Sequence, residues 1–171
     1  GNTLMMGDIV QVRGANNDDA TSYRVVLSPS CDIQRGRSKV ERALLAKCTE
    51  GRDYVVHGVG ISNAKKVKER LPIALNEAHA GGFVLLPSLP GCFPPLAVNM
   101  RALDLVAVDG IGQPREGDHE YRRVVSVDSP FREQLAWAYL QISGRPGMPD
   151  RDHSATVEEL LGQLEPGAVK K

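Results

Sequence analysis

Cysteine, long apolar runs and an excess of either charge are scarce or missing in this sequence. The three cysteines, Cys31, Cys48 and Cys92, are an odd number at wide spacings, with no Cys-x-x-Cys pair. This pattern argues against a disulfide framework and predicts reduced thiols in a cytoplasm. A zinc site built from these cysteines and a histidine would fit no common ligand spacing, so neither a metal nor a cofactor is predicted.

The missing apolar runs and the balanced charge also limit the partners. No run approaches the ~18 residues that a membrane-spanning helix needs, and no charged segment followed by an apolar one marks a secretory leader. We therefore predict no membrane contact and a cytoplasmic location. Lys plus Arg and Asp plus Glu number 21 each, so any binding of nucleic acid would require a local basic patch.

What remains is typical of one small domain with a buried core, spanning residues 1–171: 42% of the residues are hydrophobic and 25% are charged. Period-two apolar patterns and turn residues predict strands over residues 7–13, 22–28, 41–49, 54–57, 83–86, 103–108 and 122–127. In the second strand, Tyr23, Val25 and Leu27 share one face, while Arg24 and Val26 share the other. Periodicity alone also allows a helix at residues 41–49, but the length of this segment and its neighbours favour a strand.

Two helices are predicted around this sheet. The charged residues 62–70 form one, with Ser62 as N-cap and an end before Pro72, within an insertion over about residues 62–80. The other begins at Ser129-Pro130 and ends at Gly144. Its apolar stripe is Phe131, Leu135, Ala138 and Ile142.

A third, short helix is predicted from the capping box at Thr156 and Glu159 to Leu164, which gives a C-terminal helical extension over residues 129–164. Residues 165–171 are predicted to be a disordered tail. The pattern as a whole predicts a mostly β fold over residues 7–127, a small curved sheet or barrel capped by helices.

Four segments resemble, in their order, the MazF/PemK-like family of growth inhibitors. They are Gly7-Asp8-Ile9-Val10, the string Val-Val-Leu-Ser-Pro at residues 25–29, the apolar strand 43–49 that ends in Thr49, and Gly-Phe-Val-Leu at residues 82–85. The resemblance covers roughly residues 7–110, with gaps. It implies an SH3-like barrel, a cytoplasmic homodimer, an antitoxin-like or other regulatory protein partner, and metal-independent endoribonuclease activity of the toxin type.

The family's strand-two arginine precedes a proline, and Ser22-Tyr23 stands at that position here. By this resemblance Arg24, two residues further on, and Thr49 are the catalytic candidates. Arg35, Arg37, Lys39 and Arg42 form the densest basic segment and are the candidate RNA-binding residues. A solvated loop is the alternative interpretation of that segment.

Two further features have alternative interpretations. Cys31-Asp32 is either a functional turn or a structural one capped by the aspartate, because a neighbouring carboxylate does not activate a thiol. Trp137 and Tyr139 lie off the main apolar stripe and mark either a partner surface or, as we favour, part of the core.

Two functions follow. One is a catalytically degenerate binding or regulatory module that acts on a protein or nucleic-acid partner. The alternative is a metal-independent endoribonuclease toxin that cleaves single-stranded RNA. The missing Arg-Pro and the zero net charge favour the binding module.

Overall fold

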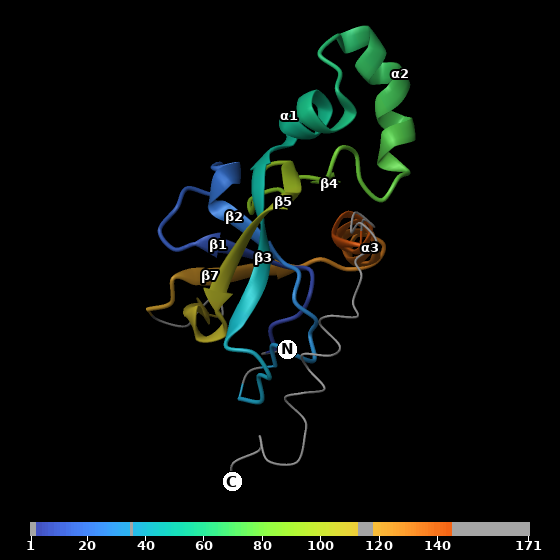
Figure 1. Ribbon diagram of the computed structural model, residues 1–171. Helices are drawn as coiled ribbons and strands as arrows, with labels where there is room; N and C mark the ends of the chain where they lie inside the picture. The colour runs from blue at the N-terminus through green and yellow to red at the C-terminus, as the bar shows by residue number, and fades with distance from the viewer. Residues whose placement is uncertain (1–2, 35, 113–117, 145–171) are drawn as a thin grey trace, which may run out of the picture.

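The computed structural model describes residues 3–34, 36–112 and 118–144, which form a mixed seven-stranded sheet with helices at one end and on one face (Figure 1). The strands are β1 (Asp8–Val12), β2 (Tyr23–Val26), β3 (Arg42–Glu50), β4 (Phe83–Leu86), β5 (Leu96–Ala107), β6 (Ile111–Gly112) and β7 (Tyr121–Ser126). Their order is β4-β5-β3-β2-β1-β7-β6, and all neighbours are antiparallel except β6 and β7. Each predicted strand but one has a counterpart here.

The exception is residues 54–57, which were predicted to be a strand and are helical. A short helix, α1 (Gly51–Asp53), continues into a π-helix, η2 (Tyr54–Val59), which ends at Gly60 with a φ of 76°. The two adjacent valines favour a strand by propensity alone. In the folded chain Tyr54 is buried against Ala80 and Ala97, and this tertiary contact overrides the local preference.

The inserted helix, α2 (Ala64–Leu75), differs from its prediction at both ends. Asn63 rather than Ser62 is the N-cap, and its side chain accepts a hydrogen bond from the Lys65 amide at 2.9 Å. The helix also continues through Pro72 to Leu75. A proline within a helix removes one hydrogen bond, and the extra turn buries Ala74. Figure 1 shows α1 and α2 beyond one end of the sheet.

One face of the sheet is covered by α3 (Phe131–Ser143). Tyr23, Val25 and Leu27 lie in the same core cluster as Leu135 and Ala138 of α3. The predicted division of the second strand into two faces is therefore confirmed, since Val26 belongs to a separate cluster on the other face. The apolar stripe of α3 is confirmed too, because Phe131 and Ile142 pack against the same core cluster that contains Leu135 and Ala138.

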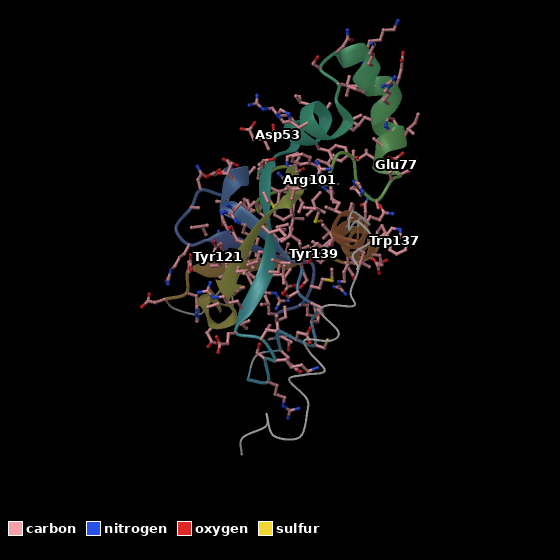
Figure 2. All side chains as sticks on the ribbon, viewed as in Figure 1. Asp53, Glu77, Arg101, Tyr121, Trp137 and Tyr139 are labelled. Atoms are coloured by element: carbon pink, nitrogen blue, oxygen red, sulfur yellow. The ribbon has the colours of Figure 1, made fainter. Side chains whose placement is uncertain are left out.

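The predicted end of α3 at Gly144 is confirmed, but the start of the helix and the burial of Trp137 differ from their predictions. Pro130 precedes the first helical residue and follows a cis peptide bond, and the Ser129 side chain does not cap the helix. Tyr139 packs against the core, as predicted, but Trp137 is 60% exposed, which contradicts the prediction. Figure 2 shows Trp137 on the side of α3 away from the sheet. The predicted helix 156–164 and the tail 165–171 lie outside the described residues.

The second core cluster lies on the opposite face of the sheet from α3. Its members come from every strand but β4 and include Val10, Val26, Leu45, Val106 and Tyr121. The hydrogen-bonded order nevertheless has two ends, β4 and β6, so the described sheet is open and a closed barrel is not confirmed. The coarser prediction, a β-sheet domain with an inserted helix and a helix after the last strand, is confirmed. No helix within the described ranges is long and apolar enough to cross a bilayer.

Candidate functional site

The two sequence motifs that prompted the family resemblance pair directly with each other. β1 and β2 are antiparallel neighbours with Ile9 opposite Val25, and the amide of Gly7 donates to the carbonyl of Val26 at 2.8 Å. Gly7 has a φ of 86°, in the left-handed region that favours glycine. The Ser28 hydroxyl accepts from the Leu44 amide at 2.7 Å and so fixes the end of the second motif against β3. Both motifs therefore specify backbone geometry at the centre of the sheet.

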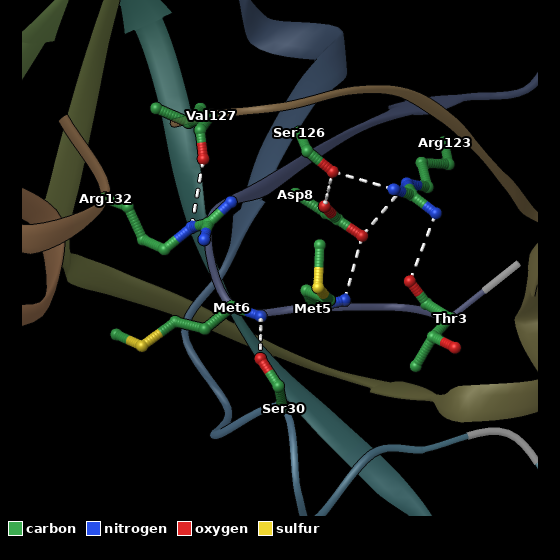
Figure 3. A network of polar contacts seen from close by, with 9 residues as sticks. All are labelled: Thr3, Met5, Met6, Asp8, Ser30, Arg123, Ser126, Val127 and Arg132. Carbon is green, nitrogen blue, oxygen red and sulfur yellow. Dashed lines mark hydrogen bonds and ion pairs between the residues drawn. The ribbon is translucent and has the colours of Figure 1, made fainter. Parts of the chain in front are cut away.

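Asp8 of the first motif is fully buried in a polar network with the start of the chain and β7 (Figure 3). Its carboxylate forms an ion pair with the Arg123 Nε at 3.0 Å, accepts from the Met5 amide at 2.9 Å, and accepts a hydrogen bond from the Ser126 hydroxyl. Arg123 also donates to the Thr3 carbonyl at 3.1 Å. Sequence reasoning assigned Asp8 no role, because Arg123 and Ser126 are more than a hundred residues away.

Arg24, the first catalytic candidate, lies on β2 directly opposite Lys47 of β3. Its Nε donates to the Asp104 carboxylate at 2.8 Å, and an Nη donates to the carbonyls of Thr21 at 2.7 Å and Tyr23 at 2.8 Å. The side chain is only 14% exposed. The guanidinium is therefore held by an ion pair and by backbone carbonyls rather than presented to a ligand.

Asp104 on β5 receives two cations at once. Arg24 contacts the Oδ2 atom of Asp104, and the Lys47 Nζ lies 3.3 Å from the other carboxylate oxygen, Oδ1. Burial alone would raise the pKa of Asp104, but hydrogen bonds and charge from Arg24 and Lys47 outweigh it and hold the pKa below its usual value. This cluster of two cations and one carboxylate carries a net positive charge, and its contacts fix the position of the Arg24 guanidinium on the sheet face.

The lowered pKa of Asp104 gives a pH prediction. Because its pKa is lower in the folded chain than in the unfolded one, its contribution to stability is complete above the unfolded pKa of about 4 and is lost as the pH falls through the folded pKa. We therefore expect the wild type to exceed Asp104→Asn in free energy of unfolding at neutral pH, and this difference to shrink under acid conditions. Urea titrations across the acid range measure it.

The exposed Asp118 supplies the control for this pH series. Its carboxylate contacts Arg13 at the surface, so the difference in free energy of unfolding between the wild type and Asp118→Asn is expected to stay small throughout the pH series. A difference between wild type and Asp104→Asn that stays constant from neutral to acid pH would contradict the assignment.

Thr49, the second catalytic candidate, lies near the end of β3 opposite Ala97. Its hydroxyl oxygen is buried and has no hydrogen-bond partner within the described part of the chain. β2 pairs with β3 only at residues 45–47, so Thr49 lies beyond the paired part of β2, about 7 Å along β3 from Lys47. Thr49 therefore lies two residues along β3 from the position opposite Arg24, and no hydrogen bond joins its hydroxyl to Arg24 within the described residues.

The candidate RNA-binding segment lies elsewhere. Arg42 begins β3, at the opposite end of that strand from Thr49, which corresponds to about 23 Å at the rise of a strand. Arg37 is exposed, and the Lys39 Nζ lies 3.8 Å from the Asp32 carboxylate. Arg35 lies outside the described residues. Within the described part of the chain, Arg42 and the catalytic candidate Thr49 therefore do not converge on one groove.

The Cys31-Asp32 turn is closed by backbone bonds. The Asp32 amide donates to the Pro29 carbonyl at 3.0 Å, and the Asp32 carbonyl accepts from the Lys39 amide at 2.9 Å and from the Ser38 hydroxyl at 3.0 Å. Cys31 is exposed, with its sulfur 3.5 Å from the Asp32 carboxylate. These contacts fit the structural interpretation of the turn.

The other two cysteines, Cys48 and Cys92, form no disulfide. Cys48 is free and buried, and burial raises its pKa to about 12 despite the opposing charge of Arg24. Cys92 is also free. Among the described residues, no three His, Cys, Asp or Glu side chains lie close enough together to hold a metal ion.

A groove of about 1140 Å³ lies between α3 on one side and the end of α2 with the loop after it on the other. One wall carries Leu75 and Glu77, and the other carries Glu133, Trp137 and Leu140. Sequence reasoning missed this site, because it depends on where the inserted helix lies relative to α3.

The two walls of the groove are tied together. The side-chain amide of Gln134 on α3 donates to the Glu77 backbone carbonyl in the loop after α2, at 2.8 Å. A smaller hollow of about 290 Å³ shares this part of the walls and is lined also by Tyr54 and Phe131. The hydrogen bond between Gln134 and Glu77 therefore fixes the distance between the two walls at this point, and the aromatic side chains of Tyr54 and Phe131 lie beside it.

Comparison with known proteins assigns this chain to no family. No protein-family profile matches the chain, and no curated protein matches it significantly. The MazF/PemK-like resemblance therefore stays a prediction that rests on the motifs at residues 7–10 and 25–29.

Proposed function

We propose that this chain is a catalytically degenerate MazF/PemK-like protein that acts as a binding or regulatory module for a protein partner. The observation that carries the proposal is the engagement of Arg24, whose guanidinium contacts Asp104 at 2.8 Å. Metal-independent RNA cleavage requires a cation free to stabilise the phosphorane and groups that transfer protons to and from the reacting oxygens. A guanidinium that is already held by a carboxylate and two backbone carbonyls serves this purpose poorly.

Thr49 supports the same proposal. Its hydroxyl is buried, so a phosphate in solvent has no access to it without movement of β3 or its neighbours. Catalytic groups tolerate little misplacement. Arg42 lies at the opposite end of β3 from Thr49, so this candidate RNA-binding residue is remote from the candidate catalytic hydroxyl.

We further propose that the sheet of this chain is a half-closed form of the MazF/PemK-like barrel. Six of the seven strands contribute to the second core cluster, so the sheet wraps around one set of side chains on that face. β4 and α2 extend the structure at the end remote from this cluster (Figure 1). The inserted helix and α3 then supply a surface that a bare barrel lacks.

An RNA assay tests the proposal. Purified protein is incubated with a long unstructured RNA in the presence of a metal chelator, at a large excess of protein. We expect the RNA to stay intact, because the Arg24 guanidinium is engaged by Asp104 and the Thr49 hydroxyl is buried. Gel electrophoresis of the RNA measures the result, and an active ribonuclease shows that the RNA is cleavable.

The variants Arg24→Ala and Arg13→Ala separate cleavage by this protein from contamination. Arg13 is a second strand-end arginine, which contacts the exposed Asp118. Cleavage by the wild type and by Arg13→Ala that Arg24→Ala abolishes would overturn the proposal in favour of the endoribonuclease.

A further inference from the structure

α3 is apolar on two sides. Leu135 and Ala138 are buried against the sheet, whereas Trp137 and Leu140 point away from it and are 60% and 59% exposed. A surface helix normally has one apolar stripe, and a second stripe indicates a further packing partner. Leu75, at the end of α2, is a third exposed apolar side chain and faces Trp137 and Leu140 across the groove.

The groove carries negative charge at its rim. Glu77 stands on one wall and Glu133 on the other, and both are exposed. None of the described residues that line the groove is Lys or Arg, and His79 is the one further titratable side chain among them. This charge repels phosphate, which argues against stacking of RNA bases on Trp137, because RNA-binding surfaces combine aromatics with cations.

The size of the groove also narrows the class of ligand. Its volume of about 1140 Å³ is above the usual range for small-molecule pockets, and its walls are two helical segments tied at one point. A groove between helices that exposes a few large apolar side chains is the usual receptor for an amphipathic helix, which inserts residues at spacings i, i+3 or i+4, and i+7.

We propose that the groove between α2 and α3 is a docking site for a basic amphipathic helix of a partner protein. The apolar stripe of the partner packs on Leu75, Trp137 and Leu140, and Lys or Arg residues beside that stripe face Glu77 and Glu133. This inference rests on the proposed function, since it assigns the surface through which the module binds. It adds the location of that surface and the chemistry of the partner.

Trp137 is the sole tryptophan of the chain, so its fluorescence reports directly on the groove. The probe is a synthetic helical peptide of about 14 residues with Leu at the stated spacings, Lys elsewhere and no aromatic residue. Addition of this peptide to the full chain is expected to shift the Trp137 emission to shorter wavelength, because the indole leaves water. The same peptide with Glu in place of Lys is expected to bind at least about tenfold more weakly.

Variants of the groove and matched controls locate the binding. Leu140→Ala is expected to weaken binding of the Lys peptide at least about tenfold, whereas Leu105→Ala, which removes an equally exposed leucine from β5, is expected to leave it unchanged. Glu133→Lys is expected to weaken it in the same way, and Glu120→Lys, at an exposed position before β7, serves as its control.

Four results would overturn the docking proposal. The first two are equal binding of the Lys and Glu peptides, and equal effects of the groove and control variants. The third is a blue shift of the Trp137 emission that grows with protein concentration together with a doubled mass, which would mean that a second copy fills the groove. The fourth is an emission that is already blue-shifted in the dilute free chain and that Leu160→Asp reverses, which would assign the groove to the C-terminal residues of this chain. The RNA assay is independent of all four, so failure of the docking proposal and failure of the proposed function are distinguishable.

Discussion

Replacement of Asp8 by alanine is expected to lower the free energy of unfolding by about 3–5 kcal/mol. The carboxylate is completely buried, pairs with Arg123 at 3.0 Å and accepts from the Met5 amide at 2.9 Å. Removal of one member of a buried ion pair leaves the other charge in a low-dielectric environment, and this penalty exceeds the gain that the pair provided. Chemical denaturation followed by circular dichroism measures the change.

Two further variants test the cause of this loss. Asp8→Asn keeps the size and part of the hydrogen bonding and is expected to lose less stability than Asp8→Ala. Asp118→Ala removes the carboxylate of another aspartate–arginine pair, with Arg13, which lies at the surface, and is expected to leave the unfolding transition in place. Equal effects of Asp8→Ala and Asp118→Ala would show that burial of the network does not matter.

The role of Asp8 also changes the meaning of the first motif. Gly7 adopts a left-handed backbone and donates to Val26, and Asp8 joins the N-terminal segment to β7. Both residues shape the sheet and neither presents a group to solvent. A motif with such a structural role is good evidence for a fold and weak evidence for an activity.

Strand positions could be predicted wherever apolar alternation is regular. Residues 41–49 and 83–86 correspond to β3 and β4 almost residue for residue. β5 begins at Leu96, but only residues 103–108 were predicted, because the pairing of β3 with β5 shifts register between Ala46 and Lys47 and interrupts the alternation on β5. A bulge of this kind depends on the partner strand and leaves no local signal.

The candidate site shows the same limit. The placement of Arg24 on the face opposite Tyr23 follows from the strand period and is confirmed. Its partner Asp104 lies 80 residues away, so the ion pair that occupies Arg24 could not be inferred from spacing. Exposure of Trp137 likewise depends on the position of α2 relative to α3, and the helical pattern of α3 alone does not contain that information.

Replacement of Leu135 by alanine is expected to lower the free energy of unfolding by about 2–5 kcal/mol. Leu135 has no exposed surface and packs in the cluster that joins α3 to β2 and β5. The substitution removes buried apolar area and leaves a cavity, and the rigid sheet beneath it limits collapse. Thermal and urea denaturation of the full chain measure the loss.

Leu140→Ala is the matched control, since it makes the same chemical change on the same helix at a side chain that is 59% exposed. We expect its unfolding free energy to stay within about 0.5 kcal/mol of the wild type, while its binding of the basic peptide weakens at least about tenfold. The pair of variants therefore separates the two apolar sides of α3: one stabilises the fold and the other is free for a partner. A loss of stability in Leu140→Ala equal to that in Leu135→Ala would mean that Leu140 already packs within this chain, and the groove would then have no second apolar face to offer.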